Sequence, residues 1–417
     1  MKILNSLTLR LILKRLLISL SVILFLRIGS FLPVPGINHT DLALYIQTNL
    51  AVKNIVSTFS GEDTFVIGLF TLNIFPYINA SIIIQLIIAF SPSLSKLQKE
   101  GDLNARRSLN RLTRFITLIW AIIQSFGIGL YLRQVLFDWS YQLLFEIVLC
   151  LTTGAMIVLW LSELITDYGL GNGASLLIYT NIVSSFPNLC KTIIIENNDN
   201  WNSISIFGIS SLIILSLFGI ILLQEGIRRI PLISSKQLNQ SVNNLNTYIP
   251  LKLNQAGVMP IILTTAVLVL PSYINNLGFL PILNFSRLGI FSNILYWMIY
   301  FGFILAFSSF YSTIVLNPKD ISDQLQKMSV TIPEIRPGVQ TTFYLKKVMQ
   351  RLTLIGAFAL AILATLPNFI EIIFNISSLN GLSTTSLLIM AGVLVDITRE
   401  VDDIIYSNIY KKKLINL

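Results

Sequence analysis

The chain has 417 residues, of which 54% are hydrophobic and 12% are charged, and its mean hydropathy is +0.74. Soluble domains carry about 25% charged residues, so this composition indicates a protein that crosses a membrane several times and excludes an ordinary soluble domain. The net charge of +9 does not favour a nucleic-acid-binding protein, because the basic residues are scattered between apolar segments, as topology-setting residues are.

The N-terminal segment resembles a secretory signal, because Lys14 and Arg15 precede a strongly apolar run. No small-residue cleavage site follows this run, so we expect an uncleaved first membrane span. A span needs about 20 mainly apolar residues, and ten segments qualify as candidates. In chain order they are Leu16–Val34, Ile67–Phe90, Phe115–Val135, Leu144–Ile165, Gly171–Cys190, Ile204–Gln224, Gly257–Ile274, Ile290–Leu316, Leu352–Ile372 and Ser383–Ile397.

The basic residues lie mostly on one side of this topology. With ten spans, both termini share a side, here called side A, with the loops 91–114, 225–255 and 317–351 and a short turn near Asp167. Side A holds 24 of the 29 Lys and Arg residues, side B holds four, and Arg27 lies within the first span. This bias identifies side A as the cytoplasm-equivalent side and supports the number ten.

Two of the side A loops, 225–255 and 317–351, are longer than ordinary connections and are therefore expected to be functional. Their basic residues fit two interpretations. They are either ordinary topology-setting charge or a docking surface for an acidic or nucleic-acid-bearing partner, and the residues alone leave both open.

The stretch 57–91 joins a polar first part to an apolar second part, and Asn73 and Pro76 interrupt the helix between them. Irregular backbone at membrane depth persists only where protein or a water-filled cavity surrounds it. The stretch therefore indicates a cavity, as in a channel or a carrier.

Chemistry inside the spans is sparse. His39 is the single histidine, and Cys150 and Cys190 form no CxxC pattern, so multi-histidine metal sites are excluded, redox motifs and zinc knuckles are unsupported, and no cofactor is expected. An ion-coupled carrier would need mid-span ionisable groups, and an intramembrane enzyme would need a paired catalytic or metal-ligand set. Neither is found in the sequence, so a passive channel is favoured over these two alternatives.

Two isoleucine pairs, Ile78 with Ile82 and Ile178 with Ile182, are each spaced four apart on one helix face. The spacing fits packing or lipid contact, and it also fits a constriction that closes a pore by excluding water. The GLGNG run, Gly169–Gly173, lacks the spacing of a phosphate-binding loop. It predicts a tight turn between two spans, with Asn172 capping the next helix.

Eight segments in order and at matching spacing closely resemble the SecY family, the central subunits of the Sec protein-translocation channel. They are RIGSFLPVPGI (Arg27–Ile37), NIFPYINASIIIQL (Asn73–Leu86), GLGNGASLLI (Gly169–Ile178), RRIPL (Arg228–Leu232), IPLKLNQAGVMPII (Ile249–Ile262), IPEIRPGVQT (Ile332–Thr341), VMQRLTLIGA (Val348–Ala357) and TSLLIMAGVLVD (Thr385–Asp396).

The resemblance implies an all-α fold of ten transmembrane helices, arranged as two inverted five-helix halves that form an hourglass channel. The halves would be residues 1–190 and 191–417, and the loops 225–255 and 317–351 would belong to the second half. A plug helix at about 57–69 would block the resting pore from side B. It would include Ser60, Gly61, Thr64 and Phe65.

The resemblance also implies site residues. A lateral gate between spans two and three and spans seven and eight would carry Gln85 and Gln124. Arg228, Arg229 and Arg336 would dock a motor or a ribosome. The pore ring would be formed by Ile78, Ile82, Ile178, Ile182, Ile262 and Ile389.

The family implies no enzyme activity, because the driving energy comes from the SecA ATPase or the ribosome. Partners would be SecE, the signal recognition particle pathway, preproteins and membrane lipid, with no nucleic-acid recognition beyond ribosome docking; the presence of SecG is left open. The tails and loops are trimmed relative to other members of the family, and together with the abundance of Ile and Asn this resembles algal plastid-encoded members. A thylakoid membrane is therefore expected, with a bacterial plasma membrane as the alternative.

Overall fold

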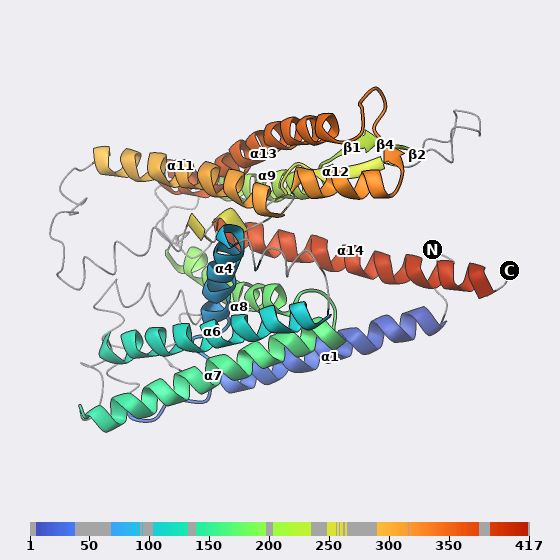
Figure 1. The fold of residues 1–417 in the computed structure, drawn as a ribbon. Helices are drawn as coiled ribbons and strands as arrows, with labels where there is room; N and C mark the ends of the chain where they lie inside the picture. The colour runs from blue at the N-terminus through green and yellow to red at the C-terminus, as the bar shows by residue number, and fades with distance from the viewer. Residues whose placement is uncertain are drawn as a thin grey trace. The chain divides into compact units, whose positions relative to one another are not determined.

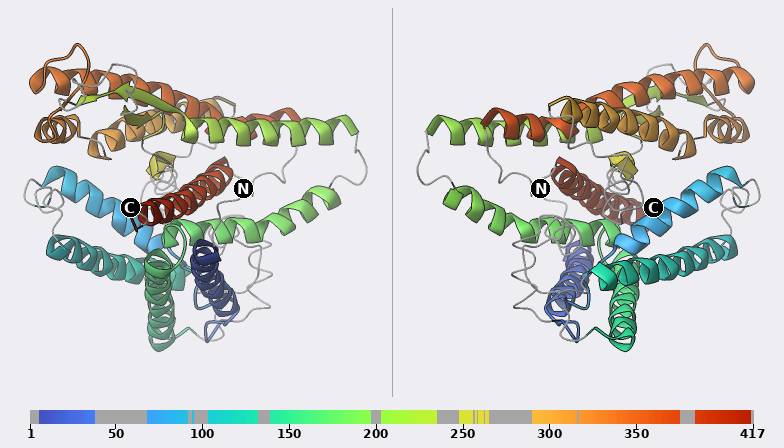
Figure 2. Two further views of the ribbon diagram at one scale, coloured as in Figure 1. Left: turned by 90° about the vertical axis from the view of Figure 1, so that its right-hand side faces the viewer. Right: turned by 90° about the vertical axis from the view of Figure 1, so that its left-hand side faces the viewer.

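The computed structural model is mostly helical and describes residues 6–37, 68–91, 94, 103–131, 139–196, 203–234, 248–255, 257, 259–261, 263–264, 290–315, 317–374 and 384–415 (Figures 1 and 2). In chain order its elements are α1 Ser6–Ser30, α4 Phe75–Phe90, α6 Leu103–Tyr131, α7 Tyr141–Tyr168, α8 Gly173–Glu196, α9 Ser203–Glu225, β1 Ile227–Pro231, β2 Ile233–Ser234, β3 Tyr248–Lys252, α11 Ile290–Val315, α12 Pro318–Lys327, β4 Val330–Thr331, α13 Val339–Phe374 and α14 Thr384–Ile415.

The candidate spans coincide with helices wherever most of their length is described. The seventh candidate, Gly257–Ile274, lies mostly outside the described residues. Within the described chain, three helices are long and apolar enough to cross a membrane, namely Arg107–Leu130, Tyr141–Tyr168 and Val339–Thr365. The predicted helical fold with membrane-capable helices is confirmed, whereas the count of ten spans and their inverted arrangement stay predictions.

Several helices are longer than the apolar segments that predicted them. On side A, α6 begins at Leu103 rather than Phe115, α13 begins at Val339 rather than Leu352, and α14 continues to Ile415. The apolar pattern ends where contact with lipid ends, but the backbone hydrogen bonds of a helix can continue into water. The polar ends therefore extend these helices beyond the expected limits.

The second candidate span, Ile67–Phe90, shows the opposite correction, because its described residues 68–74 form turns and the helix α4 begins only at Phe75. Thr71 and Asn73 donate backbone hydrogen bonds to the carbonyl oxygens of Gly68 and Phe70, at 3.1 and 2.9 Å, which closes two successive turns. Asn73 has a positive φ of 47°, which ends the turn region. Pro76 then lies in the first turn of α4, where its missing N–H leaves no hydrogen bond unmade.

The described chain forms two compact units. The first comprises Met1–Glu196 with Val393–Leu417, and the second comprises Asn197–Gly392. In the first unit, α6 packs against α4 and α7, and α7 also contacts α1 and α8. In the second unit, α13 packs against α9, α11 and α12, and β1 pairs with β3. The boundary between the units falls inside α14, which is one continuous helix.

Backbone contacts hold the segment that leads into α4. Gly68 forms an isolated bridge with Pro33, and the Leu69 N–H donates a 2.8 Å hydrogen bond to the Leu32 carbonyl oxygen. Gly154 of α7 lies so close that a Cβ atom at this position would be 2.0 Å from the Leu69 carbonyl oxygen. The first unit therefore depends on the absence of a side chain at residue 154.

We predict that Gly154→Ala destabilises the protein, because a methyl group cannot fit against the backbone of Leu69 without moving α4 or α7. Overpacking of this kind costs about 1–3 kcal/mol. The matched control is Gly127→Ala on α6, where an added Cβ would meet nothing within 4 Å. Thermal unfolding of the purified complex in detergent measures both variants. Equal melting temperatures for the two would contradict the prediction.

Candidate functional site

Five of the six isoleucines predicted to form a ring lie among the described residues. Ile78 and Ile82 of α4 are buried, with exposed fractions of 6% and 7%, so neither forms part of the outer surface of the first unit. Ile178 and Ile182 of α8 and Ile389 of α14 are half-buried. The sixth, Ile262, lies outside the described residues. Their assembly into one ring stays a prediction.

The two glutamines predicted at a gate lie on neighbouring helices, Gln85 on α4 and Gln124 on α6. Both side chains are half-buried. Within the described structure, the Gln124 Oε1 and the Trp120 Nε1 are buried and have no hydrogen-bond partner. These two atoms come from residues one helical turn apart, so α6 carries a polar pair on one face. The predicted plug residues Ser60, Gly61, Thr64 and Phe65 lie outside the described residues.

A polar cluster on the first unit was not predicted from the sequence. The Arg114 guanidinium donates two hydrogen bonds of 2.8 Å to the two carboxylate oxygens of Glu163, which joins α6 to α7 by a bidentate ion pair. The only signal in the sequence was that both residues fall at the side A ends of consecutive spans. The pair borders a cavity of about 210 Å³, lined by Tyr77, Asn110, Thr113, Arg114, Ser162, Glu163, Thr166, Asp167, Asn172 and Ala174.

The turn between α7 and α8 has the geometry that the GLGNG run predicts. Gly171 has a φ of +78°, a region that favours glycine. The Asn172 Oδ1 accepts a 3.1 Å hydrogen bond from the Ala174 N–H, which confirms the predicted cap. The structure adds one partner that the sequence did not reveal. The Gly171 N–H donates a hydrogen bond to the Glu400 Oε2 of α14.

In the second unit, two of the predicted docking arginines lie on a β-hairpin formed by β1 and β3. The strands are antiparallel, with Arg228 opposite Leu251 and Arg229 opposite Pro250. Both arginine side chains are exposed, and the Arg229 guanidinium carbon lies 4.9 Å from the centre of the Tyr248 ring. This cation–π contact orients one arginine along the outer face of the hairpin.

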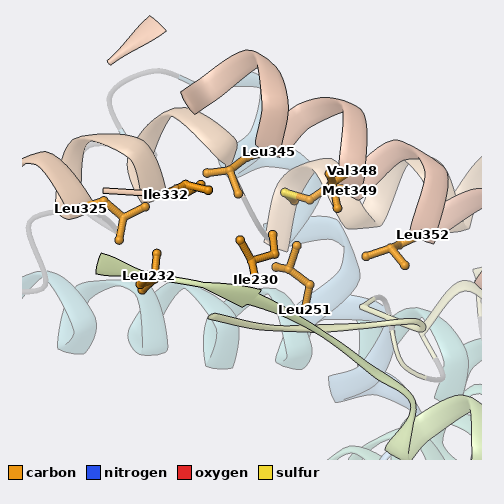
Figure 3. Close-up of a cluster of buried hydrophobic side chains, with 9 residues drawn as sticks. All are labelled: Ile230, Leu232, Leu251, Leu325, Ile332, Leu345, Val348, Met349 and Leu352. Atoms are coloured by element: carbon orange, nitrogen blue, oxygen red, sulfur yellow. The ribbon is translucent and has the colours of Figure 1, made fainter. Parts of the chain in front are cut away.

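A small apolar core supports this hairpin (Figure 3). Its buried side chains come from β1, β3, α12, α13 and the segments beside them. They are Ile230, Leu232, Leu251, Leu325, Ile332, Leu345, Val348, Met349 and Leu352. Because the core joins both long side A loops, it holds the hairpin and the second loop as one folded surface.

Arg336, the third predicted docking arginine, is exposed on a loop whose backbone is fixed. The Thr341 hydroxyl donates a 2.9 Å hydrogen bond to the Arg336 carbonyl oxygen, and the Ser322 hydroxyl of α12 donates a 3.0 Å hydrogen bond to the Gly338 carbonyl oxygen. These contacts satisfy two backbone acceptors of the loop. The guanidinium itself is exposed.

The segment that follows β3 is tied to two long helices. The Leu253 N–H donates to the Gly226 carbonyl oxygen at 2.8 Å, and a Cβ at Gly356 of α13 would be 2.3 Å from the Leu253 carbonyl oxygen. The Ser312 hydroxyl of α11 donates a 2.9 Å hydrogen bond to the Gln255 Oε1 and lies 2.8 Å from the Thr353 hydroxyl of α13. The hairpin is thus fixed to α11 and α13.

The family model of SecY matches residues 68–398, which is more than half of the chain. The chain belongs to the SecY family. The protein translocase subunit SecY of Trieres chinensis is 59% identical over 411 residues and aligns with 96% of this chain and 97% of its own length. SecY of Guillardia theta is 43% identical, over 95% and 96% of the two chains. SecY of Synechocystis is 40% identical, over 95% and 93%.

Solved structures share the fold of this SecY-family chain at low sequence identity. A structure described as "The structure of a protein conducting channel" has a TM-score of 0.64 and 17% identity, and the match covers 94% of this chain and 92% of that one. The channel protein Sec61 of the canine ribosome-channel complex has a TM-score of 0.60 and 17% identity, with the same coverage. The family model and the relatives in sequence confirm the family relation predicted from the sequence motifs, and these solved structures show the shared fold.

We predict that Thr353→Val loosens the contact between α11 and α13, and with it the position of Ser312, which holds Gln255. Valine keeps the shape of threonine but removes the hydroxyl that partners the buried Ser312, which should cost about 1–2 kcal/mol. The matched control is Thr365→Val on the same helix, where the hydroxyl donates to the Ile362 carbonyl oxygen of its own helix. Thermal unfolding in detergent compares the variants. A Thr353→Val protein that melts no lower than the control would contradict the role of this contact.

Proposed function

We propose that this protein is the central pore-forming subunit of a Sec translocon, a passive channel for unfolded preproteins that also releases transmembrane segments sideways into lipid. The observation that carries the proposal is the SecY family match, which extends over nearly every described helix from α4 to α14. The likeness in fold to a solved protein-conducting channel along 94% of the chain supports it.

The proposed constriction is a ring of the isoleucines Ile78, Ile82, Ile178, Ile182, Ile262 and Ile389. Aliphatic side chains bind no particular group of a passing polypeptide, so the channel accepts many sequences. When they close on one another they exclude water, and ions cannot cross a dry constriction. The burial of Ile78 and Ile82 supports this role, because residues on the lipid surface would be exposed.

The proposed architecture has ten spans in two inverted halves, residues 1–190 and 191–417, with a plug at about 57–69. The fixed segment from Gly68 to Ile74 supports the plug assignment, because it gives the proposed plug a firm end beside α4. The lateral gate would include Gln85 and Gln124, and the buried, unpartnered Oε1 of Gln124 fits a polar position that opens to water with the gate.

The proposed docking surface consists of Arg228, Arg229 and Arg336, and it would bind the SecA ATPase or a ribosome on side A. Two relatives in fold were solved as ribosome complexes, which supports a ribosome as one partner. SecE, and SecG where it is present, would complete the complex, and the signal recognition particle pathway would deliver part of the substrates. The chain itself would supply no enzymatic step.

A thylakoid membrane is the proposed location. Relatives at 59% and 43% identity come from Trieres chinensis and Guillardia theta, and relatives from cyanobacteria follow at about 40%. This mixture of algal and cyanobacterial relatives fits a plastid protein. Purification from the native membrane, with identification of the subunits that co-purify, tests location and partners together.

We predict that Arg336→Glu abolishes motor-driven transport, because it places a negative charge where an anionic partner surface docks. Proteoliposomes containing the complex, the motor ATPase and a preprotein measure transport as protease-protected preprotein. The wild-type complex should protect preprotein only when ATP is present, and its failure to do so would contradict the channel function. The control is Lys347→Glu, an exposed charge reversal on α13. Undiminished transport by Arg336→Glu would contradict the docking role.

We predict that Ile389→Asn wets the constriction, so that preproteins with defective signal sequences are exported several-fold more. The control is Leu394→Asn, which introduces the same side chain into α14 about 140° further round the helix. Leu394 is exposed, so its replacement should leave the constriction unchanged. Export of defective and intact preproteins is compared in the same assay. Unchanged selectivity in Ile389→Asn would contradict the ring assignment.

A further inference from the structure

We propose that Glu400 is a positioning residue whose carboxylate fixes the rotation of α14 about its own axis, and through it the direction in which Ile389 points. The inference rests on the proposed function, because the direction of Ile389 matters only if that residue lines the constriction.

One carboxylate joins three elements of the first unit. The Glu400 Oε2 accepts a hydrogen bond from the Gly171 N–H in the turn between α7 and α8. The Glu400 Oε1 lies 3.6 Å from the Arg15 Nη1 of α1. A hydrogen bond to a charged acceptor is stronger than one between neutral groups. The ion pair between Arg15 and Glu400 stabilises this arrangement less than the hydrogen bond does, because the two side chains are 44% and 34% exposed.

The conformation of the turn places the Gly171 N–H within hydrogen-bonding distance of α14. Gly171 adopts a φ of +78°, which other residues rarely take, and its N–H donates to the Glu400 Oε2 of α14. On α14, Ile397 also approaches the turn, since a Cβ at Gly171 would be 3.2 Å from the Ile397 Cγ1. Ile397 and Glu400 are three residues apart and therefore share one face of α14. That face is held by one packing contact and one charged hydrogen bond.

Ile389 lies on the same face as Glu400. The two residues are eleven positions apart, and three turns of an α-helix take 10.8 residues, so their directions differ by only about 20°. The helix is continuous from Thr384 to Ile415. A rotation of α14 that separates Glu400 from Gly171 therefore also turns Ile389 by a similar angle.

Within the described structure, the Glu400 carboxylate contacts two other elements of the first unit, the turn between α7 and α8 through Gly171 and α1 through Arg15.

The test uses the full complex in proteoliposomes and measures two quantities, ion leak through the resting channel and export of a preprotein with a defective signal sequence. Glu400→Ala removes both contacts and should raise both quantities several-fold. Glu400→Gln keeps an oxygen that accepts the Gly171 N–H, so it should lie closer to the wild type. The control is Asp403→Ala, an exposed carboxylate three residues further along α14, which should change neither quantity.

A double variant shows whether Glu400 acts through Ile389. If it does, adding Glu400→Ala to Ile389→Asn should raise the leak no further than Ile389→Asn alone. A double variant whose leak is the product of the two single-variant increases would overturn the inference. A Glu400→Ala protein that behaves like the Asp403→Ala control would also overturn it. If Glu400→Ala fails to accumulate, the shortened Glu400→Asp takes its place in the comparison, and a Glu400→Asp protein that leaks no more than Glu400→Gln overturns the inference.

The same experiment separates this inference from the proposed ring. A leak in Ile389→Asn together with no effect of Glu400→Ala overturns only the positioning role. An Ile389→Asn protein that neither leaks nor exports defective preproteins overturns the ring assignment. If Glu400→Ala leaks while Ile389→Asn does not, the effect of Glu400 does not pass through Ile389, and the positioning role is overturned as well.

Discussion

Helices in a bilayer gain little by hiding apolar side chains from one another, because the lipid around them is equally apolar. Close approach of backbones and a few internal polar contacts must hold such a protein together. This chain uses both. Gly154 and Gly356 let α7 and α13 touch the backbones of Leu69 and Leu253, and the hydroxyls of Ser312 and Thr353 join α11 to α13. The proposed channel depends on these contacts, since the position of its constriction follows from the positions of its helices.

A different force acts on side A. The core around Ile230, Leu251 and Leu345 buries apolar side chains from strands and helices together, as the core of a soluble domain does. The three arginines of the proposed docking surface are exposed around it. The second unit therefore combines an apolar core that supports the proposed docking surface with close backbone and hydroxyl contacts between its long helices. The Gln255–Ser312–Thr353 contacts connect the two.

The sequence predicted the helices and turns that depend on local patterns of residues. The length of the apolar segments predicted the helices, and the basic-residue bias predicted which loops share a side. The GLGNG run predicted the turn with its Asn172 cap. The pattern could not give the polar ends of α6, α13 and α14, because helical hydrogen bonding does not stop at the lipid boundary. The short strands were also missed, and so were the pairs Arg114–Glu163 and Gly171–Glu400, whose partners are 49 and 229 residues apart. The ring, gate and docking residues came from the family resemblance, since isoleucines four apart suit packing equally well.

The length of α13 has a mechanical consequence. Its 36 residues extend about 54 Å, whereas the hydrocarbon layer is about 30 Å thick. Between Val339 and Pro367, which cannot donate a helical hydrogen bond, α13 carries Leu345 and Leu352 of the side A core and continues into its apolar segment. A large particle seated on the exposed end would therefore impose any tilt on the whole length of the helix as far as Pro367, where the helix can bend.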